Sequence, residues 1–342
     1  MTRYALPDEA TIPALGLPRH IFDYALQRDA MPAAIARGTG MPGDGGPPLA
    51  GALISPAQCL HLLSNTLREL DSADTSFMLG QQLLPGDDAQ LAAAFRQAVS
   101  VQHALEIVCA WPGRLSPLLR PRLHVAADGQ LVLYWTDSHG APRLRPALVE
   151  LHMTAVVSMV RWLGGKRLPW RFCFNRARPR HIEQHEVHLG GDLRFDCQLD
   201  AMLLDAASAR LAWPDAHGEA CSSALAAWGE ANGEVPPPSL LDALYDYLLG
   251  EIRRNPTLEG ASLAFGVSPA TLKRHLSRCG THFVGELDQV RTHVAMYLFQ
   301  SHGADNEAVA NYLGFHDAAN FRRSFKRWTG LTPALLRAAL AI

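Results

Sequence analysis

The sequence predicts an α+β part followed by an all-α part, in which two helix-turn-helix units are joined by a connecting helix. Three observations predict this. The 342 residues are enough for two separate cores. In the first part, the apolar spacing changes from helical to alternating. A helix–glycine–helix pattern occurs twice in the last hundred residues. We expect an α+β domain at 1–231, a proline-rich linker at 232–238 and the all-α domain at 239–342.

The later helix-turn-helix unit covers about 305–329. Gly314 stands where a tight turn between helices requires positive φ, and Asp317 can accept hydrogen bonds from the first N–H groups of the next helix. Phe321 and Phe325 are four residues apart, so they share one buried face of that helix. The opposite face carries only basic charge, from Arg322, Arg323, Lys326 and Arg327.

The earlier unit covers about 257–279 and repeats this design. Gly266 marks the turn, Ser268 the cap and Pro269 the first helical position. The segments 272–276 and 321–325 share one order: apolar, basic, arginine, polar, apolar. One basic helix face is usually plain solvated surface. Two such faces in a phased repeat favour a surface that binds nucleic acid.

The net charge of −2 argues against a nucleic-acid binder, but the distribution of the charge reverses that argument. Gly266–Arg278 holds three basic residues and no acid, and Gly314–Arg327 holds four basic residues and one acid, the cap. Between the two units, His282–Ser301 has helical apolar spacing. At 1.5 Å per residue this connecting helix spans about 30 Å, close to the ~34 Å of one DNA turn. The two basic helices are therefore predicted to enter successive major grooves.

The last third of the chain resembles the DNA-binding domain of the AraC/XylS family of bacterial transcription regulators. The matching residues are Arg291, Ala295, Leu298, Val309, Ala310, Leu313, Gly314, Phe315, Asp317, Asn320, Phe321, Arg323, Phe325, Lys326, Gly330, Thr332, Pro333 and Arg337. The resemblance implies a regulator of transcription, as an activator or a repressor. Its implied partners are double-stranded promoter DNA, a small-molecule effector, a second copy of the chain and RNA polymerase.

The candidate DNA-contacting residues lie on the second helix of each unit. They are Ser268, Ala270, Thr271, Lys273, Arg274, His275, Arg278, His316, Ala319, Asn320, Arg322, Arg323, Lys326 and Arg327. Lysine and arginine contacts to phosphate would supply most of the affinity. Base reading is expected from Ala270, Thr271, Arg274, His275, His316, Ala319, Asn320 and Arg323. The alternative for Arg323 is a bond to a backbone carbonyl or an acid within the domain.

The first part is predicted to have helices first and strands later. Helices are expected over 19–37 (split at Pro32), 55–70, 74–84, 88–111 (broken near Ser100) and 146–163. Strands are expected in a hairpin over 122–137, and over 170–175 and 193–197. The region after Asp200 fits a strand or a helix equally well. About 12–214 resembles the effector domain of one branch of the same family. The matching residues are Phe172, Phe174, Pro179, Gly190, Phe195, Leu203 and Leu211. The β-only sugar-binding fold of the founding member is not expected, because too much of this part is helical.

No catalytic motif occurs, so we predict a protein that is not an enzyme and needs no cofactor. The alternatives are a DNA-binding dimer without an effector, and an enzyme with a DNA-binding appendage. The six scattered cysteines fit buried thiols in a reducing compartment. The start of the chain has no apolar signal core, and no apolar run is long enough to span a bilayer, so a cytoplasmic protein without a membrane partner is expected.

Two further features of the first part could bind ligands. His181, His185 and His188 would share a face on a helix, but the neighbouring residues favour extended structure, so no metal site is predicted. The basic stretches Gly113–Arg122 and Arg171–Arg180 could hold an anionic effector or could be plain surface. The surface interpretation is preferred, and the pocket residues for an effector stay unknown.

Overall fold

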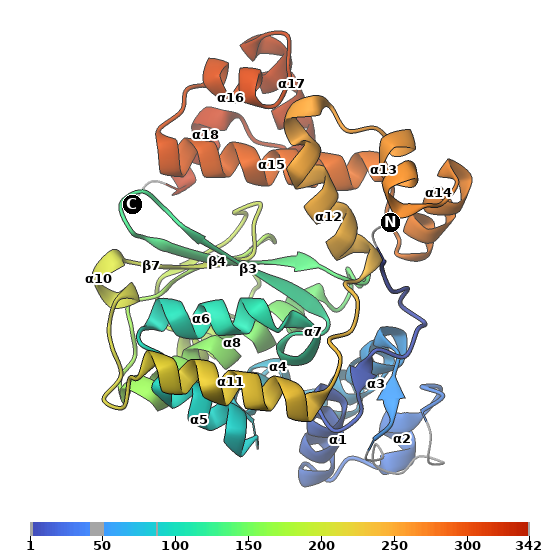
Figure 1. Ribbon diagram of the computed structural model, residues 1–342, viewed down its shortest axis with the longest axis vertical. Coiled ribbons are helices and arrows are strands. Elements are labelled where there is room, and N and C mark those ends of the chain that lie inside the picture. Colours follow the sequence, from blue (N-terminus) through green and yellow to red (C-terminus); the bar gives the residue numbers. More distant parts are fainter. Residues whose placement is uncertain (1–2, 42–50, 87, 341–342) are drawn as a thin grey trace.

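The computed structural model of the chain describes residues 3–41, 51–86 and 88–340. Its apolar side chains form two large cores, one between Ile12 and Trp228 and the other between Leu240 and Leu336. The helices of the second core lie above one face of a β-sheet, and the helices of the first core cover the opposite face and extend beyond it (Figure 1).

The first helices confirm the local predictions. Helix α1 (Leu17–Gln27) ends before Pro32, which begins α2 (Pro32–Ala36). Ser55 caps α3 (Pro56–Leu70) through a reciprocal pair of bonds with Gln58, and α4 (Thr75–Leu83) follows. A small antiparallel pair, β1 (Ile12–Pro13) with β2 (Leu53–Ile54), was not predicted. The sequence also predicts a loop at 38–48, which is rich in glycine and proline, and its residues 42–48 lie outside the described residues.

The helical stretch expected over 88–111 is broken where the sequence indicates. Helix α5 (Ala89–Gln97) ends before Ser100, whose hydroxyl accepts from the His103 N–H at the start of α6 (Val101–Ala110). A short helix, α7 (Pro112–Leu115), follows. Helix α8 (Arg145–Gly164) ends at Gly165, which has φ 68°.

The main sheet has the strand order β3-β4-β7-β5-β6. The strands are β3 (Leu119–Val125), β4 (Leu131–Asp137), β5 (Arg171–Cys173), β6 (Leu193–Arg194) and β7 (Ala201–Leu204). The predicted hairpin is confirmed, with Gly129 at φ 84° in its turn. Alternate side chains of β4 divide between the two faces. Leu131, Leu133 and Trp135 enter the large core, and Val132 and Tyr134 face the opposite side.

The sequence did not predict the secondary structure of two segments. The region after Asp200, which fitted either class, contains β7, α10 (Ala206–Ala209) and α11 (Gly218–Asn232). The segment with the three histidines was expected to be extended, and this was wrong: Glu183–His188 is helix α9. The six cysteines are free thiols, five buried and Cys109 half-buried.

The second core is built by helices alone. Its elements are α12 (Leu240–Glu251), a 3-10 turn (Ile252–Arg254), α13 (Leu258–Phe265), α14 (Pro269–Arg278), α15 (Phe283–His302), α16 (Asn306–Tyr312), α17 (Ala318–Thr329) and α18 (Pro333–Leu340). The pairs α13–α14 and α16–α17 are the two predicted helix-turn-helix units, and α15 is the connecting helix. At 20 residues α15 spans about 30 Å.

Within the described ranges, one helix, α8, has the length and apolar composition of a membrane span. However, 61% of its most apolar window is buried inside the structure. A Cβ at Gly80 of α4 would lie 2.3 Å from the Leu151 carbonyl oxygen of α8, so the two helices are in close contact. Helix α8 is therefore the central helix of the first core.

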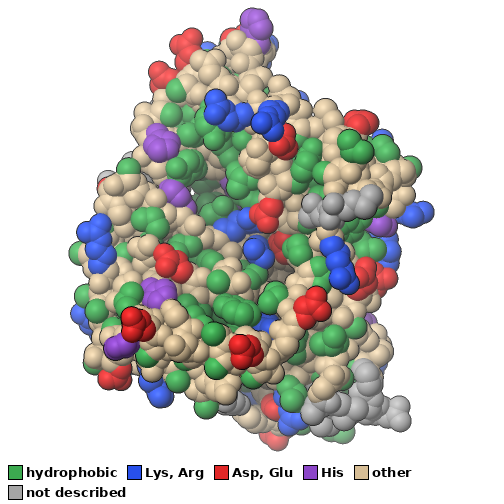
Figure 2. Space-filling model, viewed as in Figure 1, with side chains coloured by type: hydrophobic (Ala, Val, Ile, Leu, Met, Phe, Trp, Pro, Cys, Tyr) green, Lys and Arg blue, Asp and Glu red, His purple; other side chains and the backbone are tan. Residues whose placement is uncertain are grey.

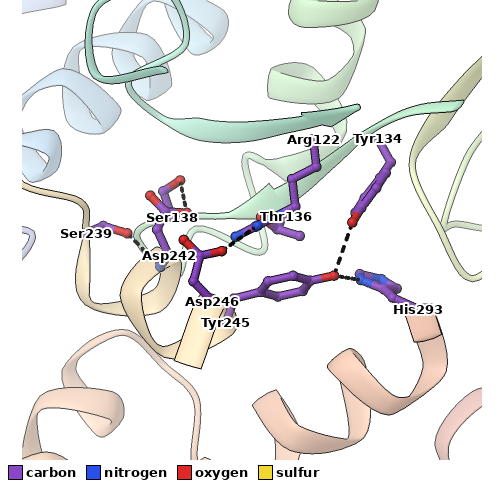
Figure 3. A network of polar contacts seen from close by, with 9 residues as sticks. All are labelled: Arg122, Tyr134, Thr136, Ser138, Ser239, Asp242, Tyr245, Asp246 and His293. Atoms are coloured by element: carbon purple, nitrogen blue, oxygen red, sulfur yellow. Dashed lines mark hydrogen bonds and ion pairs between the residues drawn. The ribbon is translucent and has the colours of Figure 1, made fainter. Parts of the chain in front are cut away.

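The sheet face opposite α8 meets α12 and α15 through polar groups (Figure 3). Arg122 Nη1 lies 2.6 Å from Asp246 Oδ1, and the guanidinium lies 3.8 Å from the centre of the Tyr245 ring. The Tyr245 hydroxyl lies 2.9 Å from His293 Nδ1 and 3.4 Å from the hydroxyl of Tyr134. These contacts hold the all-α part against β3 and β4.

Candidate nucleic-acid interface

The geometry of α14 follows from its first residues. Gly266 has φ 69° and ends α13, so the chain turns before Ser268. The Ser268 hydroxyl accepts from the Thr271 N–H at 3.1 Å, which caps α14. Leu272 and Leu276 are fully buried against the second core. The opposite face of α14 therefore points outward.

Helix α17 repeats this arrangement with an acid as the cap. Asp317 Oδ1 accepts from the Asn320 N–H at 2.6 Å, and Phe321 and Phe325 are fully buried. Gly314 takes φ 74°, and a Cβ there would lie 3.0 Å from the Asn255 side chain. The turn of the later unit thus requires glycine both for its backbone angle and for space.

The outward faces of α14 and α17 carry exposed cations. Among the described residues, no hydrogen bond or ion pair reaches the side chains of Lys273, Arg274, Arg322, Lys326 and Arg327, and all five are exposed. An exposed cation without a protein partner keeps its full charge available for an external anion. The structure places all five on second helices, as the sequence predicts.

Asn320 and Arg323 form a chain of contacts on α17. The Arg323 Nη2 donates to Asn320 Oδ1 at 2.5 Å, and the Asn320 amide donates to Asp317 Oδ2 at 3.0 Å. The internal partner of Arg323 is thus a neighbouring amide, and neither a backbone carbonyl nor an acid. Ala319 and His316 are exposed near the start of this helix. The side chains of Asn320 and Arg323 lie on the outer surface of α17, and this chain of contacts to the capping residue Asp317 orients them.

The first residues of the chain occupy part of α14, which the sequence did not predict. The Tyr4 hydroxyl lies 3.1 Å from His275 Nδ1, and the Tyr4 ring packs against Phe265. Asp8 Oδ2 accepts from Arg278 Nη2 at 2.8 Å. Two candidate DNA-contacting residues, His275 and Arg278, therefore have protein partners here, whereas Lys273 and Arg274 do not.

Arg291 of α15 packs against two aromatic rings of the later helix-turn-helix unit. Its guanidinium lies 5.5 Å from the Phe315 ring centre and 5.9 Å from that of Trp328, with Asp288 at 3.9 Å. Burial lowers the pKa of this guanidinium, although the nearby Asp288 raises it. Arg291 therefore packs the connecting helix α15 against α17 and helps to set the orientation of α17.

The histidine cluster has other partners than a metal. His185 Nε2 lies 2.8 Å from Arg176 Nη2 and 3.2 Å from Glu150 Oε1. His188 stacks on Phe77 and bonds to a glutamine of α4. His181 is exposed, beyond the start of α9. Over the part of the chain that the structure describes, no group of three or more metal-type ligands is found.

Both parts of the chain match models of known protein families. The family model described as the arabinose-binding domain of AraC transcription regulators matches residues 32–212, and a helix-turn-helix domain model matches 262–339. An ornithine utilization regulator of Pseudomonas aeruginosa is 39% identical over 84 residues, 25% of each chain. An uncharacterized helix-turn-helix-type transcriptional regulator of Mycobacterium tuberculosis is 33% identical over 79 residues, 23% of each chain. The chain thus spans about a quarter of the length of the curated relatives it matches.

Solved structures also resemble the chain. The transcriptional regulator CdpR from Pseudomonas aeruginosa aligns over 77% of this chain and 86% of its own, with 19% identity and a TM-score of 0.39. A DNA-binding transcriptional dual regulator from Escherichia coli K-12 aligns over 31% of this chain and 96% of its own, with 24% identity and a TM-score of 0.29. The family assignment depends on neither likeness, since the first family model alone spans more than half of the 342 residues. With that match and the two helix-turn-helix units, the chain belongs to the AraC family of transcription regulators.

Proposed function

We propose that the protein is a homodimeric regulator that binds promoter DNA by placing α14 and α17 in two successive major grooves. The observation that carries this proposal is the pair of outward cationic faces on helices capped in the same way. The connecting helix α15 supports it, because about 30 Å is close to the ~34 Å between equivalent groove positions.

The proposed contacts divide by chemistry. The side chains of Lys273, Arg274, Arg322, Lys326 and Arg327 make no hydrogen bond or ion pair within the described residues, and they would neutralise phosphates. Asn320 and Arg323 lie near the start of α17, where side chains of a recognition helix reach base edges. Asparagine pairs with adenine and arginine with guanine in the major groove. Ser268, Ala270, Thr271, His275, Arg278, His316 and Ala319 complete the proposed contact set.

The first part, 1–231, would bind a small effector and mediate dimerisation, and 232–238 would link it to the DNA-binding part, 239–342. Contact with RNA polymerase and a cytoplasmic location complete this role, which requires binding and no catalysis. The family model over 32–212 supports an effector domain. The ornithine utilization regulator shares only 25% of its length with this chain, so its name does not identify the effector here.

Footprinting on the DNA upstream of the protein's own gene tests the proposal. Two protected segments about one helical turn apart are expected on one face of the duplex. The double variant Lys273→Ala/Arg274→Ala should lose one segment, and Arg322→Ala/Lys326→Ala the other. Protection confined to a single half-turn, or loss of both segments in both variants with normal folding, would contradict the two-groove arrangement.

A further inference from the structure

A cavity lies where the two parts of the molecule meet. Its volume is about 290 Å³, and its walls come from β3, the end of β4, the linker and the first turns of α12. The linker contributes Pro236–Pro238, and the N-terminal segment contributes Ala5, whose N–H donates to the Pro238 carbonyl. Pockets for drug-sized ligands measure about 300–1,000 Å³, so this cavity suits a small metabolite.

Arg120 brings a positive charge to this cavity. It stands two residues before Arg122 on β3, so both side chains lie on the sheet face that meets α12. Arg122 is paired with Asp246, but no hydrogen bond or ion pair among the described residues reaches the guanidinium of Arg120. Arg120 is half-buried, and an incompletely solvated guanidinium is a strong site for a carboxylate.

The opposite wall of the cavity carries negative charge. Asp242 and Asp246 project from the first turns of α12 into the boundary between the two parts (Figure 3). Asp242 is buried and accepts a hydrogen bond from the Ser138 hydroxyl at 3.1 Å. Burial raises the pKa of this carboxyl to about 6, against the lowering effect of the Ser239 hydrogen bond and of the arginines on β3. A cation placed beside it would offset the cost of burying this charge.

Charged side chains also surround the cavity. On the face shown in Figure 2, acidic and basic side chains gather in the hollow between the upper helical part and the sheet-containing part. His139 lines the cavity wall, and its Nε2 lies 2.9 Å from the Pro117 carbonyl oxygen. The cavity therefore offers a positive side at Arg120 and a negative side at Asp242 and Asp246.

We propose that this cavity is the effector site and that it binds a free α-amino acid, with the carboxylate on Arg120 and the ammonium group on Asp242 and Asp246. The charges of the four groups Arg120, Arg122, Asp242 and Asp246 cancel, which matches a zwitterion and disfavours a ligand of one sign. The proposal rests on the proposed function, because it assigns the effector of that regulator.

The position of the site would allow a bound ligand to influence DNA binding. A ligand there touches the sheet, the linker, the N-terminal segment and α12 at once. It can bias the arrangement of the two parts only through a difference in affinity between arrangements. The same N-terminal segment carries Tyr4, which contacts α14. Ligand binding and DNA binding should therefore be coupled in both directions.

Thermal unfolding of the full chain tests the site with the twenty proteinogenic amino acids as probes. At saturating concentration, at least one should raise the Tm by about 2–5 °C. Succinate, which lacks the amine, and putrescine, which lacks the carboxylate, should each give less than half of that shift. No shift with any amino acid, or an equal shift with either control compound, would overturn the proposal.

Substitutions in and outside the cavity test whether the amino acid binds there. Arg120→Gln should abolish the shift, while Arg161→Gln should keep it, because Arg161 is exposed near the end of α8 and lines no wall of this cavity. Asp242→Asn, which keeps the size of the side chain, should reduce the shift for amino acids and leave the protein folded. If Arg120→Gln does not fold, equilibrium dialysis with the Asp242→Asn protein decides, and unchanged amino-acid binding would overturn the site.

The two proposals fail separately. A protein that protects its promoter DNA but binds no amino acid keeps the proposed function and refutes this site. A protein that binds amino acids through Arg120 but protects no DNA keeps the site and refutes the proposed function.

Discussion

The hydroxyl of Tyr4 lies 3.1 Å from Nδ1 of His275, a contact between residues 271 positions apart. Together with the ion pair between Asp8 and Arg278, it ties the start of the chain to the helix proposed to read DNA. A DNA contact through Nδ1 of His275 or Nη2 of Arg278 would have to replace these bonds. In the proposed DNA complex, the N-terminal segment would compete with DNA for one side of α14.

We expect the double variant Tyr4→Phe/Asp8→Asn to bind promoter DNA more tightly, by about two- to fivefold. Exposed ion pairs are worth up to ~1 kcal/mol, which sets this range. Fluorescence anisotropy with labelled promoter DNA measures the change. Asp215→Asn is the matched control, since Asp215 is exposed and the same charge is removed far from α14 in sequence. An unchanged Kd in the double variant would show that the contacts of Tyr4 and Asp8 with α14 do not compete with DNA binding.

Lys326 and Arg322 test the phosphate contacts. Because neither has a protein partner within the described ranges, replacing either with alanine should leave the fold intact. Each variant should bind promoter and random DNA less tightly by the same factor, and the slope of log K against log salt should fall by about 1. A loss on promoter DNA alone, with an unchanged salt slope, would contradict a phosphate role.

Asn320 tests base reading. The variant Asn320→Ala removes a side chain that also orients Arg323 at 2.5 Å. Binding should weaken by about 1–3 kcal/mol on the promoter, and the loss should map to one or two adjacent base pairs in a set of single-base variants. Arg323→Ala should affect an overlapping position. An equal loss on every sequence would remove Asn320 from the base-reading group.

Local signals in the sequence predicted the elements that depend on a few neighbouring residues. Ser55, Ser268 and Asp317 cap helices where the sequence indicates, and Gly129 sits at the predicted hairpin turn. Each of these features needs only side chains and dihedral angles within one turn. The outward cationic faces of α14 and α17 follow from the same local spacing, which is why the candidate site was predictable.

The missed features depend on partners distant in sequence. Helix α9 has only six residues, and Nε2 of its buried His185 contacts Glu150 and Arg176 from elsewhere in the chain. Helices this short gain little from propensity and form through tertiary packing. The contacts of Tyr4 with α14, and the cavity beside Arg120, likewise join separate elements. No periodic pattern in a sequence reports such pairings.

Gly140 tests how rigidly the two parts are joined. It has φ 73°, and a Cβ there would lie 1.8 Å from the carbonyl oxygen of Cys279, just after α14. Because that atom is backbone, Gly140→Ala should push the all-α part away from the sheet while each core stays folded. Small-angle scattering should show a larger radius of gyration, and proteases should cut the segment 233–238 faster.

Gly165 supplies the control for this variant. It has φ 68°, and nothing lies within 4 Å of its Cβ position. Gly165→Ala carries the same backbone cost, about 1 kcal/mol, without a clash. If both variants give the same radius of gyration and the same cleavage rate, the contact between Gly140 and Cys279 does not hold the two parts together.

His293 makes the join between the two parts sensitive to acid. It lies on α15 beside Tyr245 and Tyr134, and it also lines a small cavity. Burial, together with the charges of Arg145 and Arg122, lowers its pKa to about 3. A histidine with a lowered pKa contributes stability above pH 6.5, and this contribution falls as the pH drops from 6.5 towards 3, by at most about 1.4 kcal/mol per pH unit.

We therefore expect His293→Gln to lose less of its Tm between pH 7.5 and pH 5 than the wild type does. In the wild type, His293 binds a proton more readily in the unfolded state than in the folded state, so acid favours unfolding. Glutamine does not titrate. Buried His152, whose pKa is lowered to about 4, contributes to the pH dependence of both proteins, so only the difference between them reports on His293. His181→Gln serves as the control, because His181 is exposed and lies outside the contacts between the two parts. Equal Tm losses in wild type and His293→Gln would show that His293 stays solvated, and that the contacts of Tyr245 with the sheet do not depend on its neutral form.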